Sequence, residues 1–211
     1  MSWKNNMRLY FHYCLFGFTN CFVLGTEGSE GREALVIDPG CMDEKIVNFI
    51  EKNEYTIRGI LITHDHVNHV HGLKTLRKIY DAPIYAVNHE ICEHRATIVH
   101  DEDKLQIGPF SVHVLSVPGH SSDSAVYQIG HLLFTGDALS AGLVGRTASS
   151  YGTTIQAMAI RKKLFSLPGN YTVLPGHGPP SSLDAERRFN FALEESEKVR
   201  NQRVPFAQDI W

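Results

Sequence analysis

Four histidines lie within eight residues of one chain segment, at His64, His66, His69 and His71. The apolar run at residues 59–62 comes just before them and predicts a buried strand that ends at Thr63. Because His64 and His66 are two residues apart, their rings point the same way in an extended segment and can share one ion. Neutral imidazole is the commonest metal ligand in proteins, and its borderline softness suits zinc or iron. The segment therefore predicts a metal site at the end of a strand.

Three further candidate ligands, His120, Asp137 and His177, each follow an apolar segment that predicts a strand. A turn of small residues separates each ligand from its strand, as in the Leu-Pro-Gly-His segment at residues 174–177. Any one of these residues alone is typical of a surface histidine or a turn aspartate. Repeated strand ends of this kind deliver scattered ligands to one edge of a fold, so we interpret the whole set as a metal site.

The pattern resembles the signature of the metallo-β-lactamase fold superfamily, H-x-H-x-D-H followed by a later His, Asp and His. The resemblance runs from Asp38 to His177 and covers most of the chain. Segments at residues 118–124, 135–139 and 145–147 are most similar to the glyoxalase II and persulfide dioxygenase branch, in its short single-domain form. It implies an α+β fold, a four-layer αββα sandwich, and we expect one domain over residues 1–211.

The resemblance also implies two neighbouring metal positions. The first would be held by His64, His66 and His120. The second would be held by His69 and His177, with Asp137 bridging both. Asp38 matches a family position that supports the metal loops, although a turn aspartate before proline explains it equally well.

Asn68 stands where the signature has aspartate. In the family pattern, a carboxylate there helps hold the second metal and orients the attacking water. An amide keeps the shape but loses the charge, and it cannot accept a proton. We therefore expect one tightly bound zinc ion and a weak second one, with iron as the alternative metal, and we take Asn68 and Asp137 as the candidate catalytic residues.

Several other polar residues near the motifs receive structural interpretations. His71 is either a spare ligand or a solvated side chain, and the second is favoured. Asp65 alternates away from its histidine neighbours and is interpreted as a supporting or surface residue. Arg146 either contacts the substrate or forms a structural pair. The histidines outside the pattern are expected on the surface or packed in the core.

Composition excludes several classes of function. The 211 residues are 43% hydrophobic and 20% charged, with a formal net charge of −3, so bulk electrostatics give no support for nucleic-acid binding. No run approaches the roughly 20 apolar residues of a membrane span, and no signal peptide is expected. The four cysteines lack C-x-x-C spacing and are interpreted as free thiols of a cytoplasmic protein. We expect a small-molecule substrate and a monomer or homodimer.

The apolar pattern predicts strands and helices along the whole chain. Strands are expected at residues 9–16, 20–25, 33–38, 59–62, 84–87, 104–107, 110–117, 125–129, 131–135 and 171–174, the first two forming a hairpin. Helices are expected at residues 42–52, 73–80, 88–95, 153–167 and 181–200, the last with Ser181 as its N-cap, and a loop beside the site at residues 139–150.

The leading functional hypothesis is a metal-dependent hydrolase that uses a metal-bound hydroxide. By resemblance, its substrate would be a thioester of the hydroxyacylglutathione type. That specificity is weakened because full-length glyoxalase II has a C-terminal extension that binds glutathione, whereas this chain ends soon after its last helix. One alternative is a mononuclear-iron persulfide dioxygenase-like oxidoreductase. The other is a catalytically impaired protein that keeps the metal for binding or regulation.

Overall fold

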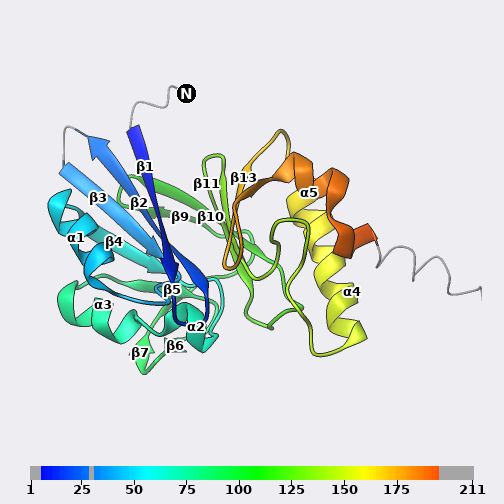
Figure 1. Ribbon diagram of the computed structural model, residues 1–211, viewed down its shortest axis with the longest axis horizontal. Helices are drawn as coiled ribbons and strands as arrows, with labels where there is room; N and C mark the ends of the chain where they lie inside the picture. The colour runs from blue at the N-terminus through cyan, green and yellow to red at the C-terminus, as the bar shows by residue number, and fades with distance from the viewer. Residues whose placement is uncertain (1–5, 29–30, 195–211) are drawn as a thin grey trace, which may run out of the picture.

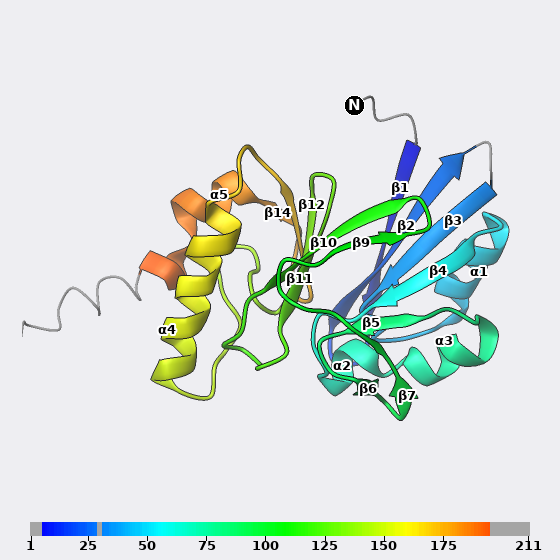
Figure 2. The same ribbon diagram turned by 180° about the vertical axis from the view of Figure 1, so that it is seen from behind.

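The computed structural model describes residues 6–28 and 31–194, which form four layers (Figures 1 and 2). Two six-stranded sheets pack face to face, and helices cover the outer face of each sheet. This arrangement confirms the predicted α+β fold and its four-layer αββα sandwich. Every helix of the described ranges is too short or too polar to cross a membrane.

The first sheet has the strand order β1-β2-β3-β4-β5-β8. Its strands are β1 (Asn6–Cys14), β2 (Thr19–Gly28), β3 (Gly31–Ile37), β4 (Thr56–Leu61), β5 (Ile84–Ala86) and β8 (Thr97–Ile98). The first three strands pair antiparallel, which includes the predicted hairpin, and the pairs from β3 to β8 are parallel. The ends of β3 and β4 therefore lie at the same edge of this sheet.

The second sheet has the order β14-β13-β12-β11-β10-β9. Its strands are β9 (Lys104–Ile107), β10 (Phe110–Ser116), β11 (Ala125–Ile129), β12 (Leu132–Gly136), β13 (Thr172–Pro175) and β14 (Ser181–Ser182). β10 and β12 are both antiparallel to β11, and β13 is parallel to β12. The strands β10, β12 and β13 therefore run in one direction and end at one edge.

Three clusters of buried apolar side chains fill the three spaces between the layers. Leu35 and Ile37 of β3 pack with Phe134 between the two sheets. Ala34 and Val36, which alternate with them, face the helices on the outer side of the first sheet. A strand buried on both faces is apolar without interruption, which explains the run at residues 34–37. The third cluster fills the space between the second sheet and its helices.

Polar side chains cap the N-termini of three helices, α1 (Glu44–Lys52), α4 (Ser150–Ala159) and α5 (Leu183–Phe189). On the first sheet lie α1, the one-turn α2 (Val67–Val70) and α3 (Leu73–Ile79); on the second lie α4, the π-helix η1 (Ile160–Phe165) and α5. The Asp43 side chain accepts hydrogen bonds from the backbone N–H groups of Lys45 and Ile46, and so caps α1.

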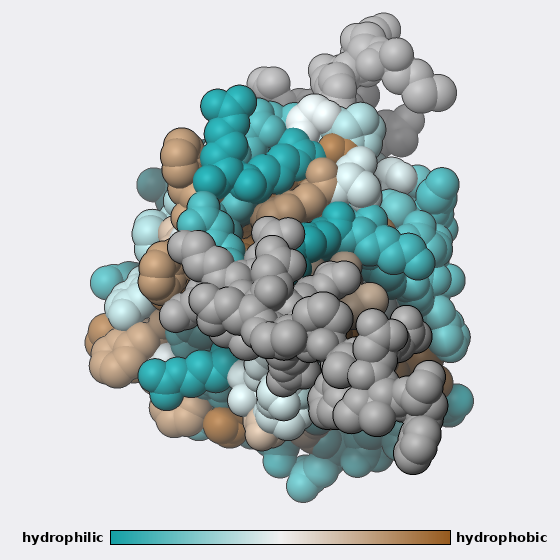
Figure 3. Space-filling model, turned by 90° about the vertical axis from the view of Figure 1, so that its right-hand side faces the viewer, coloured by the Kyte–Doolittle hydropathy of each residue, from teal (hydrophilic) through white to brown (hydrophobic). Residues whose placement is uncertain are grey.

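The face over α4 and α5 shows hydrophobic residues among hydrophilic ones (Figure 3).

Three of the predicted helices differ from the structure. The helix expected at residues 153–167 begins at Ser150 and continues from Ile160 to Phe165 as a π-helix. Residues 88–95 were expected to be helical, but they contain the antiparallel strands β6 (Glu90–Ile91) and β7 (His94–Arg95). Cys92 and Glu93 between them have φ angles of 48° and 66°, which a helix cannot contain and a tight hairpin turn requires.

The last helix begins two residues later than expected, because Ser182 rather than Ser181 is its N-cap. The Ser182 hydroxyl accepts from the N–H of Ala185, whereas the Ser181 hydroxyl donates to Glu186. The helix α5 ends at Phe189, and residues 195–200 of the prediction lie outside the described residues.

Backbone hydrogen bonds join the two sheets at the edge where the ligand-bearing strands end. The N–H of Ala125 donates to the Thr63 carbonyl at 2.8 Å, and the N–H of Asn20 donates to the Gly176 carbonyl at 2.8 Å. The loops that follow β4 and β13 are thereby fixed relative to each other.

The Tyr127 hydroxyl makes a further link, since it lies 2.9 Å from the carbonyl oxygen of Ile62 and 3.2 Å from that of Tyr85. Tyr127 is fully buried, so these contacts have no water to replace them. We expect Tyr127→Phe to lower the free energy of unfolding by about 1–3 kcal/mol, because buried carbonyl groups lose their donor. Urea unfolding would measure it, with the exposed Tyr151→Phe as a control that leaves stability unchanged.

Candidate metal centre

The structure brings together all six residues that the sequence proposes as ligands. His64 and His66 follow β4, and His69 lies in α2. The other three, His120, Asp137 and His177, follow β10, β12 and β13. Each therefore comes from a loop at the shared edge of the two sheets, as the strand-end pattern predicted.

Three ring nitrogens form the first part of the centre. His66 Nδ1 lies 3.0 Å from His64 Nε2 and 3.1 Å from His120 Nε2. Asp137 Oδ2 lies 3.4 Å from His120 Nε2 and 4.0 Å from His64 Nε2. These four side chains are the set predicted for the first metal with its bridging carboxylate.

The second part of the centre shares Asp137. Its Oδ1 lies 3.3 Å from His69 Nε2, and its Oδ2 lies 3.5 Å from His177 Nε2. The carboxylate thus stands between the two groups of histidines, in the position that a bridging ligand needs.

Hydrogen bonds behind the rings fix which nitrogen carries the proton. The Nδ1 atoms of His120 and His177 lie 2.7 Å and 2.9 Å from the backbone carbonyls of Arg146 and Phe18. A carbonyl can only accept, so both Nδ1 atoms are protonated, and in the neutral ring each Nε2 atom carries a lone pair. Outer partners of this kind orient histidines that bind metals.

Asp38 fixes two more rings in the same way. Its Oδ2 accepts from the Thr63 hydroxyl at 2.7 Å and from His69 Nδ1 at 3.1 Å. Because that hydroxyl donates to Asp38, it accepts from His64 Nδ1 at 3.1 Å. Asp38 is buried and has a φ of 49°, and it also accepts from the Thr63 backbone. It therefore supports the ligand loops, as the resemblance implied, and is more than a turn aspartate.

The facing nitrogens fit a cation better than a proton. The Nε2 atom of His64 and, by its carbonyl partner, that of His120 carry lone pairs, so one proton on His66 Nδ1 can serve only one of them at a time. A divalent ion accepts all three lone pairs together. The second group also fits a cation, since His69 Nε2 and Asp137 Oδ1 are buried and have no hydrogen-bond partner.

The charges of the centre also favour a bound cation. Burial opposes charge on His69, but its contacts with the carboxylates of Asp137 and Asp38 outweigh burial and raise its pKa to about 9. Burial and the nearby charge of His69 lower the pKa of His64 to about 3. Burial would raise the pKa of Asp137, yet its contact with His69 holds it well below the ordinary value. The centre therefore stabilises positive charge between two carboxylates and keeps His64 neutral.

Two glycines let the loops approach closely enough. A Cβ atom at Gly136, whose φ is 49°, would lie 2.3 Å from Thr63 Oγ1. One at Gly176 would lie 2.4 Å from His69 Cε1 and 2.6 Å from Asp137 Oδ1. The small residues before Asp137 and His177 are thus required by contact between loops, beyond the need for a turn.

Asn68 lies at the second part of the centre, as the sequence indicated. Its amide nitrogen is 3.1 Å from His177 Nε2. That ring nitrogen is unprotonated, because Nδ1 donates to the Phe18 carbonyl, so the amide N–H is the donor. The lone pair that would bind the second metal is therefore already occupied by a hydrogen bond from Asn68.

Some nearby residues do not join the centre. The His71 ring is exposed and stacks on Phe16 at a centroid distance of 4.0 Å, in agreement with the solvated interpretation. Asp65 is exposed, and its backbone N–H donates to Asp123. Arg146 reaches His120 through its carbonyl oxygen rather than its guanidinium.

The sequence did not show the supporting roles of Thr63, Arg146 and Phe18. Every residue has a carbonyl group, so its use as a histidine acceptor leaves no signal in residue type. Thr63 is the exception, since a hydroxyl next to the first histidine gives a weak signal that the folded structure explains.

Comparison with known proteins agrees with this geometry. Residues 15–177 match the sequence profile of the metallo-beta-lactamase superfamily. A probable metallo-hydrolase, YqgX of Bacillus subtilis (strain 168), is 30% identical over 181 residues, which are 75% of this chain and 86% of YqgX. A hydroxyacylglutathione hydrolase of Hahella chejuensis is 28% identical over 192 residues, which are 89% of this chain and 72% of that protein.

The solved structures that resemble this fold include one with bound metal. The crystal structure of TTHA1623 in a di-iron-bound form has a TM-score of 0.72 and 26% sequence identity, and covers 86% of this chain and 98% of its own. A protein of similar fold therefore holds iron.

We expect Asn68→Asp to increase the affinity for a second metal ion. The change removes the N–H that occupies His177 Nε2 and adds a carboxylate beside it. Metal analysis after gel filtration should find one more ion per chain in the variant than in the natural protein. The exposed Asn48→Asp makes the same change of charge on α1 and should leave the natural count unchanged. Equal counts in the natural protein and in Asn68→Asp would contradict the interpretation.

We expect Asp38→Asn to weaken metal binding by about 10- to 100-fold, the range found when a partner behind a ligand is lost. An amide would place an N–H where Thr63 or His69 now donates to the carboxylate. Competition with a chromogenic chelator would measure the affinity. Asp81→Asn changes a fully exposed carboxylate and serves as the control. Equal affinity in both variants would show that Asp38 does not support the centre.

Proposed function

Because the chain belongs to the metallo-beta-lactamase superfamily, we propose that it is a metal-dependent hydrolase of thioesters of the hydroxyacylglutathione type. The observation that carries the proposal is the convergence of His64, His66 and His120 with Asp137 beside them. We take zinc as the metal and iron as the alternative.

These side chains fit a divalent ion, with His64, His66, His120 and Asp137 as its ligands. Such an ion lowers the pKa of a bound water from 15.7 to about 7 and polarises a substrate carbonyl. Asp137 keeps its negative charge at neutral pH, so it can accept a hydrogen bond from the attacking water and orient it. Asn68 cannot accept a proton, which leaves Asp137 as the carboxylate for this role.

The chemistry of the leaving group supports a thioester as the substrate. An amide nitrogen must be protonated as it departs, whereas a thiol has a pKa of about 8.5 and leaves readily as its anion. Four histidines of the centre have their Nδ1 atoms in hydrogen bonds and their Nε2 atoms on the side of the ion, and His66 turns its Nδ1 atom to that side. Within the described site, this arrangement suits a substrate that needs no general acid.

The names of the relatives support a metal-dependent hydrolase in general. The relative from Hahella chejuensis carries the name of a hydroxyacylglutathione hydrolase, and YqgX that of a probable metallo-hydrolase. A small-molecule substrate, a monomer or homodimer and a cytoplasmic location remain predictions. The oxidoreductase and the binding-only alternatives are outcomes of the experiment that follows.

We expect the purified protein to hydrolyse a lactoyl thioester of glutathione, and to leave the matching amide uncleaved. Asp137→Asn should reduce kcat/KM by about a hundredfold or more, because the carboxylate beside the ion and the water is lost. Treatment with a chelator should abolish activity, and added zinc should restore it. Asp103→Asn, a carboxylate outside the centre, should keep the natural rate.

The same protein should consume no oxygen with glutathione persulfide. Oxygen uptake that depends on iron would replace the hydrolase with the dioxygenase-like alternative. Loss of all turnover in fully loaded protein, with thioester, lactone, β-lactam and phosphodiester substrates, would favour a protein that only binds.

A further inference from the structure

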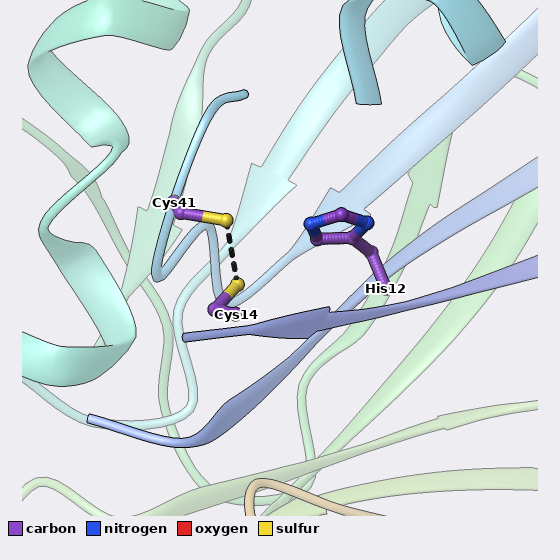
Figure 4. A group of neighbouring side chains, drawn as sticks. All are labelled: His12, Cys14 and Cys41. Atoms are coloured by element: carbon purple, nitrogen blue, oxygen red, sulfur yellow. Dashed lines mark hydrogen bonds between the residues drawn. The ribbon is translucent and has the colours of Figure 1, made fainter. Parts of the chain in front are cut away.

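A second group of ligand-type side chains lies outside the metal centre and shares no residue with it. His12 and Cys14 belong to β1, and Cys41 lies in the loop before α1 (Figure 4). One ligand atom from each of these residues lies within 4.8 Å of the others. The two sulfur atoms are 2.9 Å apart, with the Cys41 thiol donating to Cys14.

The His12 ring has a nitrogen in need of a partner. His12 is 6% exposed, and its Nε2 atom is buried and has no hydrogen-bond partner. This nitrogen lies 3.0 Å from Asp43 Oδ2, but the two groups are not aligned for a hydrogen bond. The edge of the ring points toward the two sulfur atoms (Figure 4). On its other side, Nδ1 lies 3.5 Å from the Tyr10 hydroxyl, which can orient the ring.

Asp43 adds a negative charge beside the group. One of its carboxylate oxygens caps α1 by accepting from the N–H groups of Lys45 and Ile46. The other oxygen is the one beside His12 Nε2. The capping bonds hold the carboxylate next to the His12 ring, where its charge favours a cation.

The chemistry of the donors points to a soft cation. Burial raises the pKa of both thiols, so without a nearby positive charge they remain neutral and interact only weakly. A zinc ion deprotonates a coordinating thiol outright. Its bonds of about 2.3 Å to sulfur place two thiolates of a tetrahedral ion about 3.8 Å apart, so the two sulfur atoms would move apart by about 1 Å when the ion binds.

We propose that His12, Cys14 and Cys41 bind a structural zinc ion that is separate from the metal centre. Two thiolates and one imidazole are ligands typical of structural zinc sites. The ion would tie β1 to the loop at residues 38–43. That loop also holds Asp38, and the Pro39 carbonyl accepts from the N–H of Gly72, so the ion would stabilise the support of the metal centre.

The sequence pattern conceals this group, because the cysteines lack the C-x-x-C spacing of common zinc sites. The spacing is instead His-x-Cys at residues 12–14 and Cys-x-Asp at residues 41–43. In a strand, residues two apart face the same way, so His12 and Cys14 present their ligand atoms together. The earlier interpretation of these residues as free thiols and a packed histidine describes the metal-free state.

Cobalt(II) offers a direct test, because thiolate bound to cobalt gives an intense charge-transfer absorption in the near ultraviolet. None of the six residues of the metal centre contains sulfur, so this band reports on the second group alone. Full-length protein would be reduced with a phosphine, stripped of metal and titrated with cobalt(II). We expect the thiolate band in the natural protein and in His66→Ala, which disrupts the metal centre.

We expect Cys41→Ser to lose the band and to retain one fewer zinc ion per chain than the natural protein. Cys41 is partly exposed, which makes this substitution gentler than one at the buried Cys14. Cys92→Ser, in the turn between β6 and β7, is the matched control and should keep both the band and the ion.

Two results would overturn the proposal. One is a reduced, cobalt-saturated natural protein without the band, including the case in which Cys14 and Cys41 form a disulfide before reduction and bind nothing afterwards. The other is a band that survives in Cys41→Ser. Because the natural protein is tested first, a failure of any variant to fold cannot rescue the proposal.

Discussion

The close approach of three ring nitrogens is the constraint on which the site depends. His66 Nδ1 lies 3.0 Å and 3.1 Å from two Nε2 atoms, and one proton on it can serve only one of them at a time. Such an arrangement exists only where the protein holds the rings from behind and a positive charge satisfies them in front. Carbonyl groups and Asp38 provide the first condition, and a cation bound by the centre provides the second.

The four-layer fold supplies the rigidity that holds the rings. Strands β4, β10, β12 and β13 end at one edge, and the apolar core between the sheets fixes their spacing. Asp38 sits at the end of β3 with a φ of 49°, a strained conformation for a residue other than glycine, and three hydrogen-bonded contacts stabilise it. The strain is thus located at the residue that orients both His64 and His69.

Much of this arrangement could be predicted from the sequence, because strand ends carry a strong signal. The apolar run before His64 and the small-residue turns before His120 and His177 placed the ligands correctly at one edge. The hairpin at residues 90–95 was missed because positive φ at Cys92 and Glu93 is imposed by the fold and leaves no glycine behind. Carbonyl acceptors such as that of Phe18 are invisible for a simpler reason, since residue type does not affect them. The group around His12 needs β1 and a distant loop to meet, which no local pattern records.

The Asn68 amide makes the two metal positions of the family pattern unequal. Its N–H occupies the lone pair of His177, so a second ion must break that hydrogen bond before it can bind there. At the first position, His66 Nδ1 is shared between two Nε2 atoms, and Asp137 lies beside them. The two positions therefore differ in a satisfied donor as much as in a missing charge. Any divalent ion at the second position would have to displace the same hydrogen bond, whichever metal the centre binds.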